Sequence, residues 1–295
     1  MTEPVDPDAA RDPASTVSDA VQPQSYGRAG RNLGVATIVG AALGIFLVLL
    51  PLIFAPWLFV LIVSAAMVIA AHELVGAFAT RGIALVTWPL FVGVAATAPA
   101  AYWGGTLGLI VAVGVTVLVI VAWRLIAGPD GYVADVAATT FAFSYTGLMA
   151  GFVALNLDSS QGPARVAAFV VLTICSDIGG YAAGVLAGRH PIAPSISPKK
   201  SWEGLVGSLL LQSVAGVALF IWLFEAPWWQ GLICGVVLTV TATLGDFVES
   251  ALKRDLGVKD MSSLLPGHGG LLDRLDSLLP NAFVSWALFR AFLGP

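Results

Sequence analysis

Long runs of apolar residues, separated by short polar or proline-containing stretches, dominate the chain after about residue 32. A helix needs about 20 predominantly apolar residues to cross the hydrocarbon core of a bilayer, and several runs approach or exceed this length. The pattern predicts nine spans, at 33–52, 55–78, 85–103, 106–126, 138–156, 165–187, 204–224, 228–245 and 275–293. Little more than a turn from Pro51 to Pro56 separates the first two, so a single broken segment is the alternative.

The composition is that of an integral membrane protein, because 58% of the residues are hydrophobic and only 11% are charged. We therefore predict an all-α fold, a polytopic helical bundle in the membrane. Residues 1–30 are rich in Pro, Asp, Ser and Ala and contain no apolar run, which predicts a disordered cytoplasmic tail. We expect N-terminal membrane helices at 31–160, and C-terminal helices with cytoplasmic loops that carry the candidate chemistry at 161–295.

The positions of the basic residues predict how the bundle is oriented. Lys and Arg collect in the cytoplasmic loops of membrane proteins. If the N-terminus is inside, the alternation of nine spans leaves only Arg165 and Arg290 of the 14 basic residues outside. We therefore expect a multi-pass protein of the cell membrane, with its N-terminus and both large basic loops on the cytoplasmic face.

A block of charge at 245–277 is the strongest candidate for chemistry. Asp246 and Glu249 stand at helical i, i+3 spacing, and so do Asp273 and Asp276, on either side of a Pro-Gly-His-Gly-Gly turn with interleaved cations. Carboxylates for a divalent metal, cations for phosphate and glycines for close backbone approach suit phosphoryl transfer. The alternative is a solvated loop between two spans.

Two further features lie upstream of this block. Asp177 sits well inside a predicted span, where a lone acid costs about 2.5–3.5 kcal/mol, and Tyr181 follows on the same helix face. The loop at 189–204 contains three prolines that predict an irregular chain, and Lys199 and Lys200 precede a helix start that favours phosphate. Helix packing through small residues is the alternative for Asp177, and the positive-inside rule is the alternative for the lysines.

The charged block resembles the signature of a known family. Ser-Ala-Leu-Lys-Arg at 250–254, Lys-Asp at 259–260 and Leu-Pro-Gly-His-Gly-Gly-Leu-Leu-Asp-Arg-Leu-Asp at 265–276 are similar to the motif of phosphatidate cytidylyltransferases, or CDP-diacylglycerol synthases. Ser-Pro-Lys-Lys-Ser-Trp-Glu-Gly at 197–204 and the Asp177 helix resemble further elements of that family. The resemblance covers about the C-terminal 120 residues. Ser201 stands where the family usually has Thr, and Arg189 where Lys is common.

The resemblance implies that the chain uses CTP and phosphatidic acid and makes CDP-diacylglycerol and pyrophosphate. It implies Mg²⁺ with a helper K⁺ ion, a homodimer, and no nucleic-acid partner. Metal would be held by Asp246 and Asp273, with Glu249 and Asp276 as further candidates. The remaining residues expected to act in catalysis are Lys253, Arg254, Lys259, Asp260, His268 and Arg274. Those expected to bind substrate are Asp177, Tyr181, Ser197, Lys199, Lys200, Glu203, Gly269 and Gly270.

Three other functions compete with this interpretation. A membrane CTP-dependent polyprenol or phytol kinase shares a related helical bundle, but the long signature argues against it. A transporter with an ion site at Asp177 leaves the Pro-Gly-His-Gly-Gly turn and its acids unexplained. The CDP-alcohol phosphotransferases are excluded by the missing D-G-x-x-A-R motif.

Overall fold

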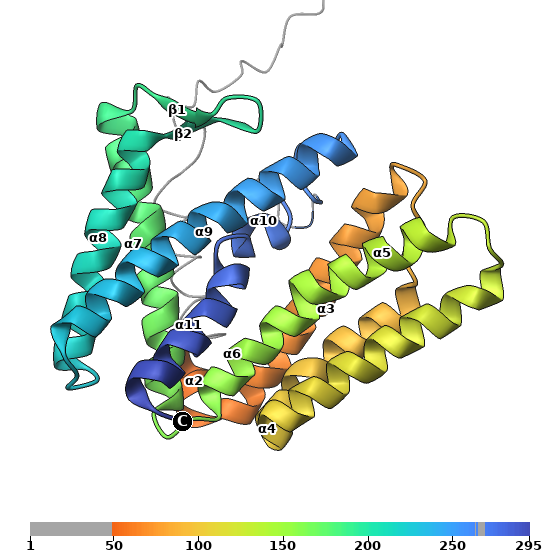
Figure 1. The fold of residues 1–295 in the computed structure, drawn as a ribbon, viewed down its shortest axis with the longest axis horizontal. Helices are drawn as coiled ribbons and strands as arrows, with labels where there is room; N and C mark the ends of the chain where they lie inside the picture. Colours follow the sequence, from red (N-terminus) through yellow and green to blue (C-terminus); the bar gives the residue numbers. More distant parts are fainter. Residues whose placement is uncertain (1–48, 263, 265–268) are drawn as a thin grey trace, which may run out of the picture. The chain divides into compact units, whose positions relative to one another are not determined.

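The computed structural model describes residues 49–262, 264 and 269–295. The predicted tail at 1–30 and most of the predicted span at 33–52 lie outside the described residues. The elements, in chain order, are α2 Leu50–Phe54, α3 Pro56–Ala79, α4 Thr87–Arg124, the 3₁₀ turn η2 Leu125–Ala127, α5 Tyr132–Phe143, the π-helical turn η3 Ser144–Leu148, α6 Met149–Leu157, α7 Gly162–Ala187, β1 Pro191–Ala193, β2 Ser197–Ser201, α8 Trp202–Trp222, α9 Trp228–Leu256, α10 Leu272–Leu275 and α11 Leu278–Leu293 (Figure 1).

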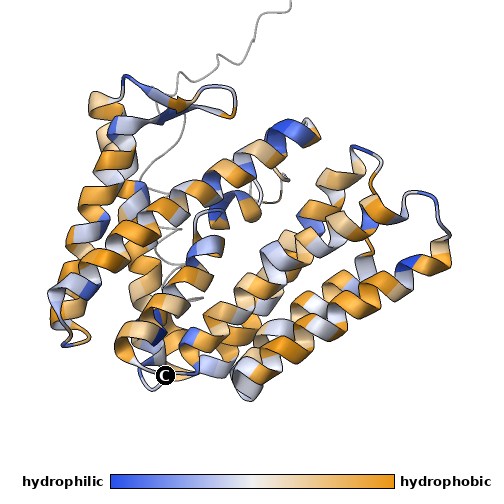
Figure 2. Cartoon of the chain, in the orientation of Figure 1, coloured by the Kyte–Doolittle hydropathy of each residue, from blue (hydrophilic) through white to orange (hydrophobic). Residues whose placement is uncertain are grey.

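Long apolar helices make up nearly all of the described chain, as predicted for a polytopic membrane bundle. Within the described ranges, six helical segments are long and apolar enough to cross a membrane, and apolar residues cover most of their length (Figure 2). The predicted break between 85–103 and 106–126 falls at Gly105, whose φ of 59° and ψ of −151° interrupt α4. The two halves of α4 then lie side by side, because a Cβ on Gly93 would meet the Thr116 side chain at 2.1 Å.

Helix α9 extends further than the span predicted at 228–245. It continues to Leu256, so Asp246, Glu249 and Lys253 lie on its last turns. The change from apolar to charged residues does not end the helix, because Glu249 and Lys253 form an i, i+4 ion pair at 2.5 Å. Gly257 then ends it with a φ of +73°.

The loop at 189–204 is only partly irregular, whereas its prolines predicted an irregular chain: it forms two short strands, and their register shifts between Pro191 and Ala193. It contains a short antiparallel pair, β1 and β2, in which Pro191 lies opposite Ser201 and Ala193 opposite Ser197. In a two-stranded ribbon both strands are edges, so a proline without an N–H group can be accommodated. This ribbon leads directly into α8, whose N-cap is Ser201.

Polar contacts fix the position of α11 against the other helices. The Asn281 side chain donates to Thr173 Oγ1 of α7 at 3.0 Å and accepts from Thr241 of α9, and the Asn156 amide of α6 donates to Ser285 at 3.2 Å. Such interhelical bonds stabilise membrane bundles, where there is little hydrophobic force between helices. They hold in place the chain segment just before α11, which carries Asp276.

The predicted basic loops meet at one end of the bundle. Thr80, after α3, donates to the carbonyl of Leu256 at the end of α9 at 3.0 Å, and Arg254 Nε donates to the carbonyl of Ile196 in the ribbon at 3.3 Å. Arg165 instead donates to the carbonyls of Leu293 and Gly294, at the C-terminal end of α11. The two large basic loops therefore share one end, as the charge pattern predicted.

Candidate active site

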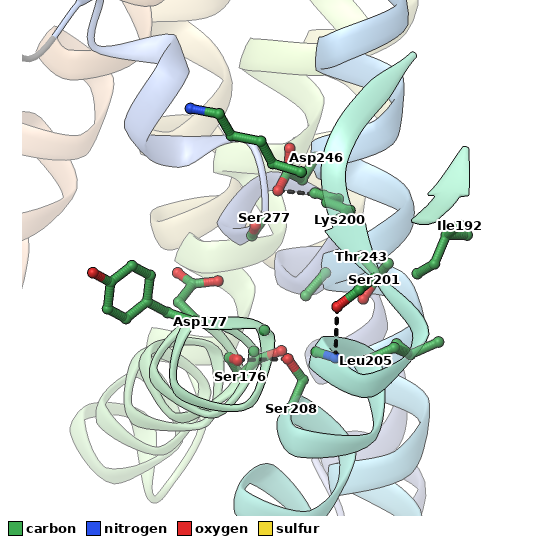
Figure 3. Close-up of a pocket in the computed structure, with 16 residues that line it drawn as sticks. Ser176, Asp177, Ile192, Lys200, Ser201, Leu205, Ser208, Thr243, Asp246 and Ser277 are labelled. Atoms are coloured by element: carbon green, nitrogen blue, oxygen red, sulfur yellow. Dashed lines mark hydrogen bonds and ion pairs between the residues drawn. The ribbon is translucent and has the colours of Figure 1, made fainter. Parts of the chain in front are cut away.

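A pocket of ≈ 350 Å³ lies between α7, the ribbon, α8 and α9, and it contains several of the predicted substrate residues. Figure 3 shows Asp177 of α7 and Asp246 of α9 within it, with Lys200 of β2 reaching toward Asp246. Lys199 and Tyr181 also line the pocket. Its size is within the range of small-molecule sites. Residues from the ribbon loop and from the charged block, far apart in sequence, therefore meet at one cavity.

Lys200 is held at the pocket by two contacts. Its ammonium forms an ion pair with Asp246 and lies 4.5 Å from the centre of the Phe247 ring. The next residue, Ser201, accepts a hydrogen bond from the Gly204 N–H at 3.1 Å and so caps α8. Threonine can make the same cap, so the Ser at this position keeps the local structure.

Three carboxylates form an acidic cluster beside the pocket: Asp246, Glu249 and Asp276 each offer an oxygen, and these oxygens lie within 4.8 Å of one another. Glu249 is only 1% exposed, and its Oε1 atom has no hydrogen-bond partner among the described residues. Asp276 is partly buried beside Asp246 and Glu249, and its Oδ1 atom accepts from the Ser277 N–H at 2.7 Å. These carboxylate oxygens are the ligands that Mg²⁺ prefers, and a divalent cation would offset their mutual repulsion. It would also give the Glu249 oxygen a partner.

Asp273 does not belong to this group of three but lies next to it through Lys253. The Lys253 ammonium contacts Glu249 Oε2 at 2.5 Å and donates to Asp273 Oδ1 at 2.8 Å. Asp273 Oδ2 also accepts from the N–H groups of Gly270 at 2.7 Å and Met261 at 3.0 Å. Burial alone would raise the pKa of Asp273, but hydrogen bonds from its neighbours hold it below its ordinary value. The predicted pair Asp246 and Asp273 is therefore on the same end of the bundle.

Glu73 of α3 is a site residue that sequence reasoning missed. It is 4% exposed and accepts three hydrogen bonds, from Ser262 Oγ at 2.6 Å and from the N–H groups of Leu271 at 2.7 Å and Leu272 at 2.8 Å. A Cβ on Gly270 would lie 2.8 Å from both Glu73 oxygens. The available signal was an acid inside the predicted apolar span at 55–78, where a charged side chain is costly unless it has partners.

The remaining predicted residues have different surroundings. Arg254 joins α9 to the ribbon, and Glu203 accepts from the N–H groups of Arg189 and His190 and contacts the His190 ring at 2.5 Å. Neither Glu203 nor Ser197 is among the residues that line the pocket. Lys259 and Asp260 are exposed and follow the end of α9. Arg274 lies in α10, and Gly269 has a φ of +78°. His268 lies outside the described residues.

Lysines and carboxylates surround a pocket at one end of a bundle of apolar helices. This arrangement is typical of a membrane enzyme that acts on anionic substrates. Residues 35–292 match the model of the cytidylyltransferase family. The chain belongs to this family, and the match extends well beyond the C-terminal 120 residues that carried the resemblance.

Relatives in this family share much of the chain. The phosphatidate cytidylyltransferase of Mycobacterium leprae is 41% identical over 277 residues, which cover 88% of this chain and 88% of that protein. The protein of the same name from Mycobacterium tuberculosis (strain H37Rv) is 40% identical over 272 residues, 88% of this chain and 83% of its own. That of Staphylococcus saprophyticus is 38% identical over 146 residues, 49% of this chain and 55% of its own.

Proposed function

We propose that this chain transfers cytidylyl groups in the pocket between α7, α8 and α9, with the acidic cluster as its metal centre. The activity follows from its relatives: CTP and phosphatidic acid give CDP-diacylglycerol and pyrophosphate, a step of phospholipid biosynthesis. One observation carries the location. Lys200 of the ribbon and Asp246 of α9 form an ion pair at the pocket, and Asp246 is also one of the three clustered carboxylates.

Electrostatics sets the first requirement of the reaction. An oxygen of the phosphatidate phosphate attacks the α-phosphorus of CTP, a new P–O bond forms, the α–β anhydride bond breaks, and pyrophosphate leaves. Both reactants are anions, so their repulsion must be offset before they meet. Lys199 and Lys200 line the pocket and supply positive charge there. Because the attacking oxygen is already ionised, the site needs no strong general base.

The acidic cluster supplies ligands for Mg²⁺. Asp246, Glu249 and Asp276 would hold it, and Asp273 lies adjacent through Lys253. When bound, Mg²⁺ neutralises charge on phosphate oxygens and stabilises the leaving pyrophosphate. Lys253 is engaged by Glu249 and Asp273, so its role is to fix these acids. The helper K⁺ ion is proposed on the family resemblance alone.

The membrane arrangement is proposed from charge. The chain would have nine spans in the cell membrane, with the N-terminus and the active site on the cytoplasmic side. The meeting of the large basic loops at one end, with Arg165 near the end of α11, supports this orientation. Phosphatidate would enter sideways from the inner leaflet, where Tyr181, 75% exposed, stands at the pocket. The homodimer is proposed from the family resemblance.

The test is conversion of labelled CTP and phosphatidate by membranes that contain the full chain, with ATP and dCTP in parallel. We expect CDP-diacylglycerol with Mg²⁺ and none with a chelator. Asp246→Asn and Asp273→Asn should each lose nearly all activity, whereas Asp255→Asn, an exposed acid on the same helix as Asp246, should keep it. Full turnover by Asp246→Asn would contradict the metal assignment.

A further inference from the structure

The β1–β2 ribbon carries Lys199 and Lys200, the two lysines that line the pocket. An isolated two-stranded ribbon is at best marginally stable in water. This one has fewer bonds than most, because Pro191 and Pro198 stand within its strands and have no N–H group to donate. Contacts with the rest of the protein must therefore hold the lysines at the pocket.

Glu203, in the first turn of α8, makes three contacts with the residues that lead into the ribbon. Its Oε2 atom accepts from the N–H groups of Arg189 at 3.1 Å and His190 at 3.3 Å. Its Oε1 atom lies 2.5 Å from His190 Nδ1. The Trp202 N–H also donates to the carbonyl of His190 at 3.0 Å. The chain that enters β1 is thus bound to the start of α8.

Glu203 is not among the residues that line the pocket, but strand pairing connects it to the lysines. Pro191 follows the two residues that Glu203 binds, and it lies opposite Ser201 in the ribbon. Ser201 directly follows Lys200 in β2. Fixing the two bound residues therefore fixes the strand that presents the lysines to the pocket.

Two contacts with α9 hold other parts of the ribbon. Arg254 Nε donates to the carbonyl of Ile196, in the turn between the strands, at 3.3 Å. Lys200 of β2 forms an ion pair with Asp246. Neither contact reaches the chain before β1, which Glu203 binds. Without the Glu203 bonds the base of the ribbon would move while its turn and β2 stay attached to α9, so the lysines would shift rather than leave the pocket.

We propose that Glu203 is a positioning residue: it binds the base of the ribbon to α8 and thereby sets Lys199 and Lys200 for the phosphates of CTP. This role replaces the substrate contact that the family resemblance implied for Glu203. The inference rests on the proposed function, because it needs CTP as the ligand of the lysines. Misplacing a binding group by about 1 Å can cost about 100-fold in rate, so a residue outside the pocket can control what happens in it.

The experiment measures KM for CTP and kcat separately, with the purified full-length protein and phosphatidate in detergent micelles. Glu203→Ala removes all three contacts and should raise KM for CTP about 10- to 100-fold. Glu203→Gln should keep KM close to the wild-type value, because both backbone N–H groups donate to one oxygen, which the amide retains. The control is Asp255→Ala, an exposed acid near the end of α9, which should leave KM unchanged.

The outcomes separate this inference from the function on which it rests. A similar rise of KM in Glu203→Gln and Glu203→Ala would mean that the negative charge acts on the substrate, and would overturn the positioning role. An unchanged KM with a lower kcat in Glu203→Ala would mean only that less of the protein is folded, and would equally overturn it. Absence of CTP turnover by the wild type would instead overturn the proposed function, before any variant is compared.

Discussion

Replacing Glu73 by Gln should loosen the segment that carries Asp273. The Glu73 carboxylate accepts from Ser262 Oγ, Leu271 N and Leu272 N at 2.6–2.8 Å, and it is nearly fully buried. Hydrogen bonds to a charged group contribute about 1.5–3 kcal/mol each. Glutamine keeps one oxygen that can accept hydrogen bonds, but its NH₂ group replaces the second oxygen. At least one hydrogen bond is therefore lost, and the NH₂ group lies against another hydrogen-bond donor.

The expected loss is about 2–4 kcal/mol in the free energy that holds this segment closed. Since 1.4 kcal/mol is a factor of ten, the population of the open segment should rise roughly 30- to 700-fold. Hydrogen exchange detected by mass spectrometry measures such local opening directly. The amides of residues 270–272 should exchange faster in Glu73→Gln by about that factor, and activity should fall because Asp273 accepts from the Gly270 N–H.

The matched control is His72→Gln, which changes the exposed neighbour on the same helix and should leave exchange as in the wild type. Equal protection of residues 270–272 in Glu73→Gln and wild type would refute the reasoning. It would mean that Glu73 is not what ties α3 to this segment.

Two further predictions concern local geometry. Ser201→Ala removes the hydrogen bond that caps the Gly204 N–H and should lower the free energy of unfolding by about 0.5–2 kcal/mol. We expect a lower melting temperature in detergent for Ser201→Ala, whereas Ser201→Thr should melt near the wild-type temperature. Equal melting temperatures of the two variants would contradict the cap. Gly270→Ala would place a methyl group 2.8 Å from the Glu73 oxygens and should lower the free energy of unfolding by about 1–3 kcal/mol. The control is Gly76→Ala, in open space on α3, which should leave the stability unchanged or raise it. The opposite order of the two alanine variants would count against the close approach.

Most helices could be predicted because each needs a long apolar run, and six long apolar helices lie in the described part of the chain. The predicted span at 33–52 lies mostly outside the described residues, and the one at 275–293 corresponds to the shorter helix α11, Leu278–Leu293. The β1–β2 ribbon could not be predicted, because its prolines indicated an irregular loop. Its two pairings, Pro191 with Ser201 and Ala193 with Ser197, appear only in the structure. The length of α9 was underestimated for a related reason. Charge marks where an apolar run ends, but paired charges such as Glu249 and Lys253 let the helix continue.

The candidate site was predictable only in part. The acids of 245–277 were found because their spacing is local, at i and i+3. Which acids share one centre depends on how α9 packs against the chain before α11, and this brings Asp276 rather than Asp273 to Asp246 and Glu249.

The central claim is that carboxylates at the end of α9 and before α11 hold the divalent cation of the reaction. Crystals of the full chain soaked with Mn²⁺ test it most directly, through the anomalous scattering of that ion. We predict a peak in contact with Asp246, Glu249 and Asp276, and its loss in crystals of Glu249→Gln. A peak elsewhere, or none in a protein that turns over with Mn²⁺, would contradict the account.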